Sequence, residues 1–304
     1  MLTSIVGINW GDEGKGRMVD LLAASQDIVV RYQGGNNAGH TVINEKGKFV
    51  LNLLPSAILR EDKVNVMGNG MVVNIEHLVK EIAHLRDGGI DGKVFRDGID
   101  ITPDRLKISD KAVVCCPFDV MQDGLEEDRL ADRKFGSTRR GIAPVYADKY
   151  MKKAIRMGDL LHPQYLRERL ETIVDWKNLM LKGMYDFDGY TVDELVAWFD
   201  TYGKPLIPYI CDVSTYLDNA LTEGKNVMLE AQLGALRDID FGIYPYTTSS
   251  STITAYGPVG AGIPWRKVDA AVGVMKAYST CVGEGPFTAE MFGEEGENLR
   301  KAGG

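Results

Sequence analysis

Residues 9–16 read Asn9-Trp10-Gly11-Asp12-Glu13-Gly14-Lys15-Gly16, and this stretch decides the fold. A short β-branched run over residues 5–8 comes before it and predicts a buried strand. From Arg17 onward the apolar residues recur at helical spacing. Strand, glycine-rich turn and helix start is the geometry that presents backbone N–H groups to phosphate. The stretch therefore predicts a phosphate-binding loop; an ordinary tight turn with a solvated lysine is the alternative.

Two features distinguish this loop from the usual G-x-x-x-x-G-K-[ST] pattern. Asn9 stands at the first glycine position, and Gly16 replaces the hydroxyl residue that would hold magnesium. Asp12 lies inside the loop instead. A carboxylate beside phosphates is repulsive unless it holds a divalent cation or takes a proton from a substrate. Asp12 is therefore the most informative residue of the chain.

A second glycine-rich loop follows the apolar strand predicted over residues 28–32. It reads Gln33-Gly34-Gly35-Asn36-Asn37-Ala38-Gly39-His40-Thr41. If the two strands are parallel neighbours, both loops leave the same carboxyl edge of a sheet, where ligands bind in such folds. His40 would then lie opposite Asp12 across one crevice. Its glycine and asparagine surroundings favour a functional histidine over a merely satisfied polar side chain.

Composition excludes several classes of protein. The chain has 304 residues and a formal net charge of −8, which disfavours a nucleic-acid binder. It has neither a signal-peptide pattern nor an apolar run of membrane-spanning length. The four cysteines show no metal-ligand spacing, and the adjacent pair Cys115 and Cys116 suits a reduced protein. We expect a cytoplasmic enzyme that binds neither nucleic acid nor membrane.

The remaining pattern predicts an α/β fold with a mainly parallel central sheet flanked by helices, forming one large domain over residues 1–304. Strands and helices alternate in the first half, helices follow, and a long loop extends from a late strand to about Pro264. The predicted elements are a hairpin over 41–54 with its turn at 44–48, strands at 64–67, 106–109, 112–115 and 226–229, and helices over 74–85 (ending at Gly88-Gly89), 162–181, 191–203 and 212–221.

Residues 123–153 are densely charged. Their centre, Gly136-Ser137-Thr138-Arg139-Arg140-Gly141, carries hydroxyls and two guanidinium groups, which suit a phosphate monoester. From the residues alone, a solvated charged loop is an equally good interpretation.

Both glycine loops together resemble adenylosuccinate synthetase, the purine-pathway ligase. The similarity continues through residues 68–70, 140–142, 238–240, 244–246 and 276–278, so it spans essentially the whole chain. It implies a P-loop-NTPase-like fold with helical and long-loop insertions. It also implies GTP-dependent ligation of L-aspartate to inosine monophosphate (IMP), through a 6-phosphoryl-IMP intermediate, in a homodimer.

The resemblance also implies residue roles. Asp12 would be the general base, His40 the general acid, and Gln232 would touch the reacting centre. One Mg²⁺ would be held by Asp12 and Gly39, and Lys152 would reach the IMP of the other subunit. GTP would contact Gly11, Asp12, Glu13, Gly14, Lys15, Gly16, Arg17, Gly39, His40 and Thr41, and IMP would contact Asn37, Ala38, Thr138, Lys152, Gln232 and Thr248.

The chain departs from the family pattern in four places. Arg139 replaces the glycine of Thr-Gly-Arg, Ala231-Gln232-Leu233-Gly234 stands for Ala-Gln-Gly, and Lys152 and Cys281 replace arginines. Relatives also continue past this length with guanine- and aspartate-binding parts, so we expect little synthetase activity from this chain alone. The alternatives are a P-loop-like GTP hydrolase or switch, and a non-catalytic nucleotide-binding remnant.

Overall fold

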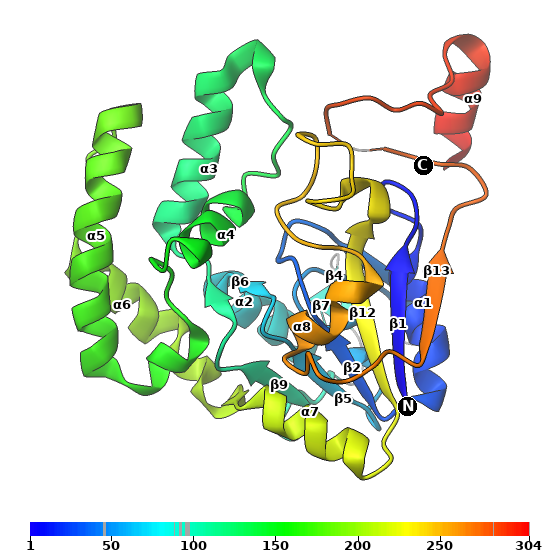
Figure 1. Cartoon of the computed structure of the whole chain (residues 1–304), viewed down its shortest axis with the longest axis horizontal. Helices are drawn as coiled ribbons and strands as arrows, with labels where there is room; N and C mark the ends of the chain where they lie inside the picture. Colours follow the sequence, from blue (N-terminus) through cyan, green and yellow to red (C-terminus); the bar gives the residue numbers. More distant parts are fainter. Residues whose placement is uncertain (45–46, 88, 91–92, 95–97, 282, 304) are drawn as a thin grey trace.

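The computed structural model describes residues 1–44, 47–87, 89–90, 93–94, 98–281 and 283–303. Its centre is a seven-stranded sheet in which every pairing is parallel (Figure 1). The strand order is β11 (Ile210–Cys211), β9 (Leu106–Ser109), β5 (Val64–Met67), β2 (Ile28–Arg31), β12 (Val227–Gly234), β1 (Leu2–Gly7) and β13 (Ala270–Val274). The predicted parallel sheet is confirmed.

The two strands that precede the glycine loops are not neighbours, contrary to the condition set from the sequence. β12 lies between them and pairs with both, with Glu230 in register with Ile5 on one side and Arg31 on the other. Because all three strands are parallel, their loops still leave the same edge of the sheet. A third loop, from β12, enters the crevice between the other two.

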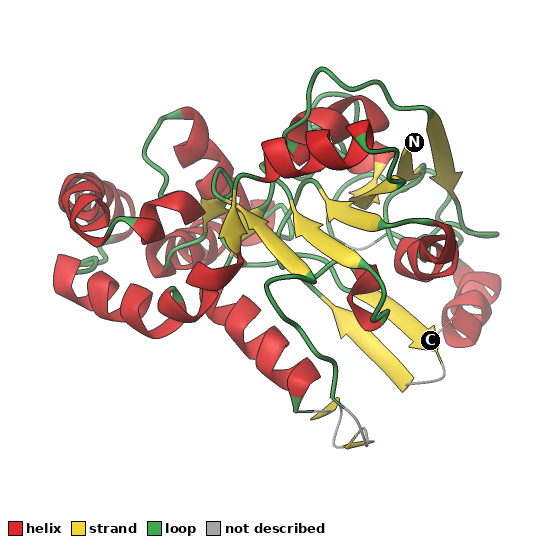
Figure 2. Cartoon of the chain, turned by 90° about the horizontal axis from the view of Figure 1, so that it is seen from below, coloured by secondary structure: helices red, strands yellow, loops and turns green. Residues whose placement is uncertain are grey.

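Helices cover both faces of the sheet (Figure 2). Successive strand residues point to opposite faces, so Val29 and Met228 pack with α1 (Lys15–Leu22), while Val30 and Leu229 pack with α7 (Val213–Thr222). Around this centre lie the short pairs β3 (His40–Asn44) with β4 (Gly47–Leu51), β6 (Val72–Val73) with β10 (Val113–Val114), and β7 (Gly89–Ile90) with β8 (Lys93–Val94), together with α8 (Gly257–Ala261) and α9 (Gly293–Gly303).

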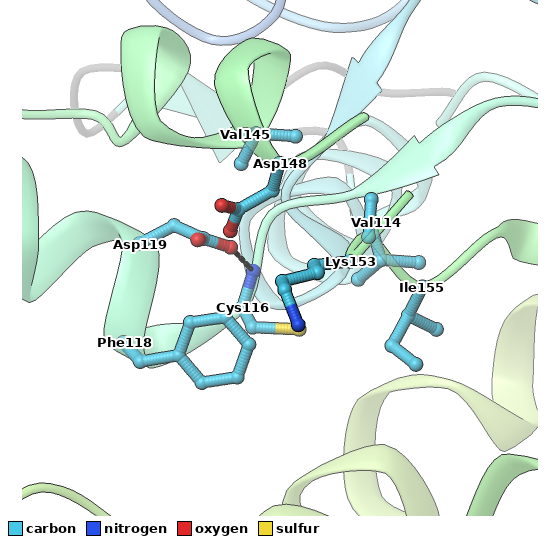
Figure 3. A pocket seen from close by; sticks show the side chains of 9 residues that line it. Val114, Cys116, Phe118, Asp119, Val145, Asp148, Lys153 and Ile155 are labelled. Atoms are coloured by element: carbon cyan, nitrogen blue, oxygen red, sulfur yellow. Dashed lines mark hydrogen bonds between the residues drawn. The ribbon is translucent and has the colours of Figure 1, made fainter. Parts of the chain in front are cut away.

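Helices α3 to α6 group together at the left of Figure 1. One buried cation links three of these helices. Lys177 Nζ lies 3.1 Å from Asp119 and 2.6 Å from Asp148, and burial, partly offset by Lys177, raises the pKa of Asp119 to about 7. Figure 3 shows Asp119 and Asp148 facing each other over a small cavity. In this group α3 spans Pro117–Leu130, α4 spans Ile142–Tyr150, α5 spans Pro163–Tyr185 and α6 spans Val192–Tyr202. Helix α2, outside the group, spans Ile75–Arg86.

Most predicted elements are confirmed to within a few residues, including the hairpin and the strands at 64–67 and 106–109. The turn residues 45–46 and Gly88 lie outside the described residues. The charged segment 123–153 holds α3 at its start and α4 towards its end, and its centre, residues 134–141, is a largely exposed loop. No helix in the described part of the chain is long and apolar enough to span a membrane.

Candidate functional site

The glycine loop connects β1 to α1 as predicted, but the helix begins at Lys15 rather than at Arg17. Gly14 caps it in the left-handed conformation, with φ of 83°. Glu13 points into the loop, where its carboxylate accepts hydrogen bonds from the backbone N–H groups of Asn9 (3.1 Å) and Gly11 (2.9 Å) and pairs with Lys15 at 2.5 Å. Glu13 thus shapes the loop from inside.

Two glycines make room for the Glu13 carboxylate. A Cβ at Gly7 or at Gly234 would lie 2.4 Å from one of its oxygens. These glycines end β1 and β12 and are in register. Any side chain at either position would expel the carboxylate and release the N–H groups it holds.

Asp12 lies on the outer side of the same loop. Its side chain is 71% exposed and its backbone is left-handed, with φ of 58°. Its carboxylate pairs with Lys276 at 2.8 Å and accepts a hydrogen bond from Thr280 at 3.1 Å. Lys276 and Thr280 follow β13, the edge strand beside β1, so a further loop contributes to the site.

His40 lies in the second loop, at the start of β3, and is buried. Its Nδ1 lies 2.5 Å from the Glu230 carboxylate, which also accepts hydrogen bonds from the Ser56 hydroxyl (2.6 Å) and N–H (2.9 Å). Burial and then the Arg31 charge lower the pKa of His40. Burial opposes ionisation of Glu230, but His40, Arg31 and Ser56 together outweigh it and lower the pKa of Glu230. A neutral His40 therefore donates Nδ1–H to an ionised Glu230 and leaves Nε2 available to a ligand.

Lys15 connects the two loops electrostatically. Its amine is buried, and burial lowers its pKa while the Glu13 carboxylate acts in the opposite direction. The charges of Asp12 and Glu230 both act on Lys15, and the charge of Lys15 acts on His40. The first turn of α1 also packs on the second loop, since a Cβ at Gly16 would lie 3.0 Å from that of His40. The predicted pairing of the two loops is thus built around this lysine.

The end of β12 brings Gln232 to the second loop. Its side-chain oxygen accepts a hydrogen bond from Arg31, and its amide nitrogen donates to Asn37 at 2.6 Å. Gly34, at φ of 76°, provides the space, because a Cβ there would lie 2.4 Å from the Gln232 oxygen. Ala38 is held through its carbonyl, which accepts from Asn52 at 3.2 Å.

The departure at Ala231-Gln232-Leu233-Gly234 contains a non-glycine residue in a left-handed conformation. Leu233 has φ of 62°, a backbone conformation that favours glycine. It lies in a bulge, because three residues of β1 (Ile5 to Gly7) are matched by five of β12 (Glu230 to Gly234). The role of Gln232 at the reacting centre stays a prediction.

Thr138 and Thr248 lie in two further loops that approach the second glycine loop. Thr138 is exposed and precedes α4, whose Ile142 would lie 2.7 Å from a Cβ at Gly35. The Thr248 N–H donates to the Arg237 carbonyl at 2.8 Å. The rings of Phe135 and Tyr246, 6.2 Å apart, link these two loops.

Thr138 precedes α4 and Lys152 follows it, so the nine residues of that helix, roughly 13 Å long, lie between them. Lys152 is exposed, with left-handed φ of 64°. Arg17, Gly39 and Thr41 are also exposed, and Arg17 faces outward from α1.

Several buried polar atoms in the two glycine loops have no hydrogen-bond partner among the described residues: Asn9 Oδ1, Trp10 Nε1, Asn36 Oδ1 and His40 Nε2. Buried polar groups are nearly always paired in proteins, so this cluster indicates a ligand with donors and acceptors. No group of three or more metal-binding side chains occurs in the described part of the chain. A metal here would need ligands from a substrate or the backbone in addition to Asp12.

Sequence reasoning missed Glu230, Arg31 and Lys276 as members of the site. Glu230 and Arg31 each end a run of buried apolar strand residues, and a charge at that point is the signal that would have found them. Lys276 follows β13, a strand that was not predicted at all.

Comparison with known proteins gives one consistent result. The family model for adenylosuccinate synthetase matches residues 4–304. Adenylosuccinate synthetases from Bacillus cytotoxicus and Caldanaerobacter subterraneus are 42% and 43% identical over 98% and 99% of this chain, and the chain covers 67% and 68% of their lengths. The structure of fully ligated adenylosuccinate synthetase from Plasmodium falciparum superposes with a TM-score of 0.88 and 34% identity, covering 99% of this chain and 68% of that one. A cyanophage S-2L succinoaminodeoxyadenylate synthetase shares the fold, with a TM-score of 0.58 and 20% identity.

Proposed function

Because the chain belongs to the adenylosuccinate synthetase family, we propose that its crevice binds IMP and GTP and supports the first step of that family's reaction, transfer of the γ-phosphoryl group of GTP to O6 of IMP. Members of the family then ligate L-aspartate to the activated purine. The observation that carries the proposal is the unpartnered Nε2 of buried His40, held by Glu230 on the opposite side of the ring.

Asp12 and His40 would act on the two sides of the transfer. Asp12 would take the proton from N1 of IMP, so that negative charge builds on O6, and its exposure on the loop leaves it open to a ligand. His40, as general acid, would donate an Nε2–H hydrogen bond that stabilises the charge on O6 and on the transferring phosphoryl group, once bound phosphates favour the imidazolium form. Lys15 and the N–H groups that begin α1 would stabilise the transferring phosphates.

Gln232 and Asn37 would orient the purine. Their side chains are already hydrogen-bonded to each other, and Arg31 fixes the oxygen of Gln232. Thr138 and Thr248 would bind the IMP phosphate. Lys152 would reach the phosphate of a partner subunit in a homodimer, which is compatible with its exposed position far from Thr138.

Asp12 and the Gly39 carbonyl would hold Mg²⁺ together with GTP oxygens. The carboxylate already attracts one cation, the Lys276 ammonium group, so its surroundings fit a positive charge. Bound Mg²⁺ would neutralise phosphate charge during the transfer.

The test is phosphate release from Mg²⁺·GTP, measured with and without IMP and in the absence of aspartate. Release that requires IMP is expected, because the 6-phosphoryl intermediate has no amine to react with and breaks down in water. Asp12→Asn should lower that release by roughly 10³-fold if the residue is both base and metal ligand. Release independent of IMP would instead identify a GTP hydrolase. Tight binding of both nucleotides by calorimetry without any release would identify a non-catalytic binding protein.

A further inference from the structure

Helix α3 carries acidic side chains on its buried face. Asp119, Asp123 and Glu127 are spaced four residues apart and therefore share one side of the helix. They are only 2%, 6% and 5% exposed. Buried carboxylates require donors, and Asp119 finds one in Lys177.

Asp123 and Glu127 find their donors in the loop that joins α3 to α4. Asp123 accepts from the Ser137 hydroxyl at 2.6 Å and from the Gly141 N–H at 2.9 Å. Glu127 accepts from the N–H groups of Phe135 at 3.2 Å and Gly136 at 3.1 Å. All four carboxylate oxygens thus hold the loop, at its beginning and at its end.

The residues between these attachment points are exposed. Thr138, Arg139 and Arg140 project from a loop whose two ends are fixed to one rigid helix. The carboxylates are occupied by the loop's own donors, so the loop hydroxyl and N–H groups that they hold satisfy their hydrogen-bonding capacity. This arrangement lets two acidic residues support a site for an anion.

We propose that Asp123 and Glu127 are positioning residues that hold loop 135–141 in the shape that presents Thr138 to the phosphate of IMP. The identity of the ligand rests on the proposed function, whereas the hydrogen bonds that hold the loop are observed whatever the ligand is. Phe135 also packs against Tyr246 in the loop of Thr248, so release of Glu127 would disturb both phosphate contacts.

Limited trypsin digestion tests the loop itself, since Arg133, Lys134, Arg139 and Arg140 are all exposed cleavage sites. Asp123→Asn and Glu127→Gln should each speed cleavage at these sites by roughly tenfold, the change that one charge-assisted hydrogen bond supplies. Asp123→Glu, which retains the carboxylate, should recover part of the protection. Glu126→Gln is the matched control, because that carboxylate of α3 accepts from Arg129 and Tyr185 rather than from loop 135–141.

Calorimetry with IMP and with Mg²⁺·GTP tests the ligand. Asp123→Asn and Glu127→Gln should weaken IMP binding by about tenfold and leave Mg²⁺·GTP binding unchanged. Circular dichroism verifies that each variant folds. Unchanged cleavage in both variants overturns the proposal, as does faster cleavage with unaltered IMP affinity. If the unmodified chain binds no IMP, the proposed function fails, and the cleavage comparison alone decides whether the carboxylates hold the loop.

Discussion

The ammonium nitrogen of Lys276 lies 2.8 Å from a carboxylate oxygen of Asp12, so the proposed base is already paired with a cation of the same chain. Thr280 donates to the same oxygen, and Lys276 donates to the Thr280 hydroxyl at 2.8 Å. A divalent cation bound to this oxygen would have to displace Lys276 or share the carboxylate with it.

Lys276→Met should therefore tighten Mg²⁺ binding. The pair is largely exposed, so its removal is worth at most about 1 kcal/mol, or roughly a fivefold change in affinity. Calorimetric titration of Mg²⁺ in the presence of GTP measures this change. Lys80→Met removes the same charge from an exposed ion pair on α2 and should have no effect. Weaker Mg²⁺ binding in Lys276→Met would mean that the lysine supports the ligand rather than competing with it.

Glu230→Gln should disturb the proton on His40. The variant keeps the shape of the side chain but loses the charge that accepts Nδ1–H, so ¹⁵N chemical shifts of the His40 ring should report a mixture of tautomers. The free energy of unfolding should fall by about 1–3 kcal/mol, and IMP-dependent phosphate release by at least about tenfold.

Glu81→Gln is the control for this variant. Glu81 is also buried and accepts two backbone N–H groups, from Asn52 and Leu53. It should lose comparable stability and retain a single His40 tautomer. Identical ring shifts in the unmodified chain and in Glu230→Gln would remove Glu230 from its orienting role.

Stability should depend on pH through His40. Its pKa lies below the ordinary 6.5, so between those two values the unfolded chain binds a proton that the folded chain does not. The free energy of unfolding is therefore highest above 6.5 and falls as pH decreases through this window. Denaturant titrations at about pH 7.5 and about pH 5.5 should show a smaller loss in His40→Gln. His77, whose pKa burial also lowers, accounts for part of the loss that remains. An equal loss of unfolding free energy in the unmodified chain and in His40→Gln would mean that His40 is not the source of the pH dependence.

Arg139 occupies a glycine-type conformation, with φ of 55°. Its side chain is exposed and pairs with Asp128. Arg139→Ala and Arg139→Gly both remove that pair, and they differ only in the Cβ that left-handed backbone disfavours. Glycine should be about 1 kcal/mol more stable than alanine at this position in urea unfolding. Equal stability would mean that the loop relaxes into another conformation in solution.

Much of the fold could be predicted from the order of apolar runs and turn residues along the chain. Short β-branched runs such as Val64–Met67 have few alternatives to a buried strand, and the glycines of residues 11–16 mark a tight turn between a strand and a helix. The insertion of β12 between β1 and β2 was not accessible, because hydrophobic periodicity carries no information on which strands pair.

The burial of Asp123 and Glu127 was not predicted. In the sequence they resemble a solvated charged face, yet they are buried because loop donors satisfy them. Nor was it predicted that the Glu13 carboxylate would occupy the space left by the missing side chains of Gly7 and Gly234. In both places the carboxylates accept hydrogen bonds from backbone N–H groups. Every residue except proline has such a group, so the sequence does not show which ones are the partners.

The central place of β12 has a consequence for how the protein is made. The loops of Asp12 and His40 belong to the first segment that a ribosome would release, but the strand that bridges them begins only at Val227. Until that strand emerges, the amino-terminal segment has unpaired strand edges and no completed crevice. The two loops are therefore linked only once Val227, 187 residues after His40, has been translated, so a nascent chain stalled earlier would lack the proposed nucleotide site.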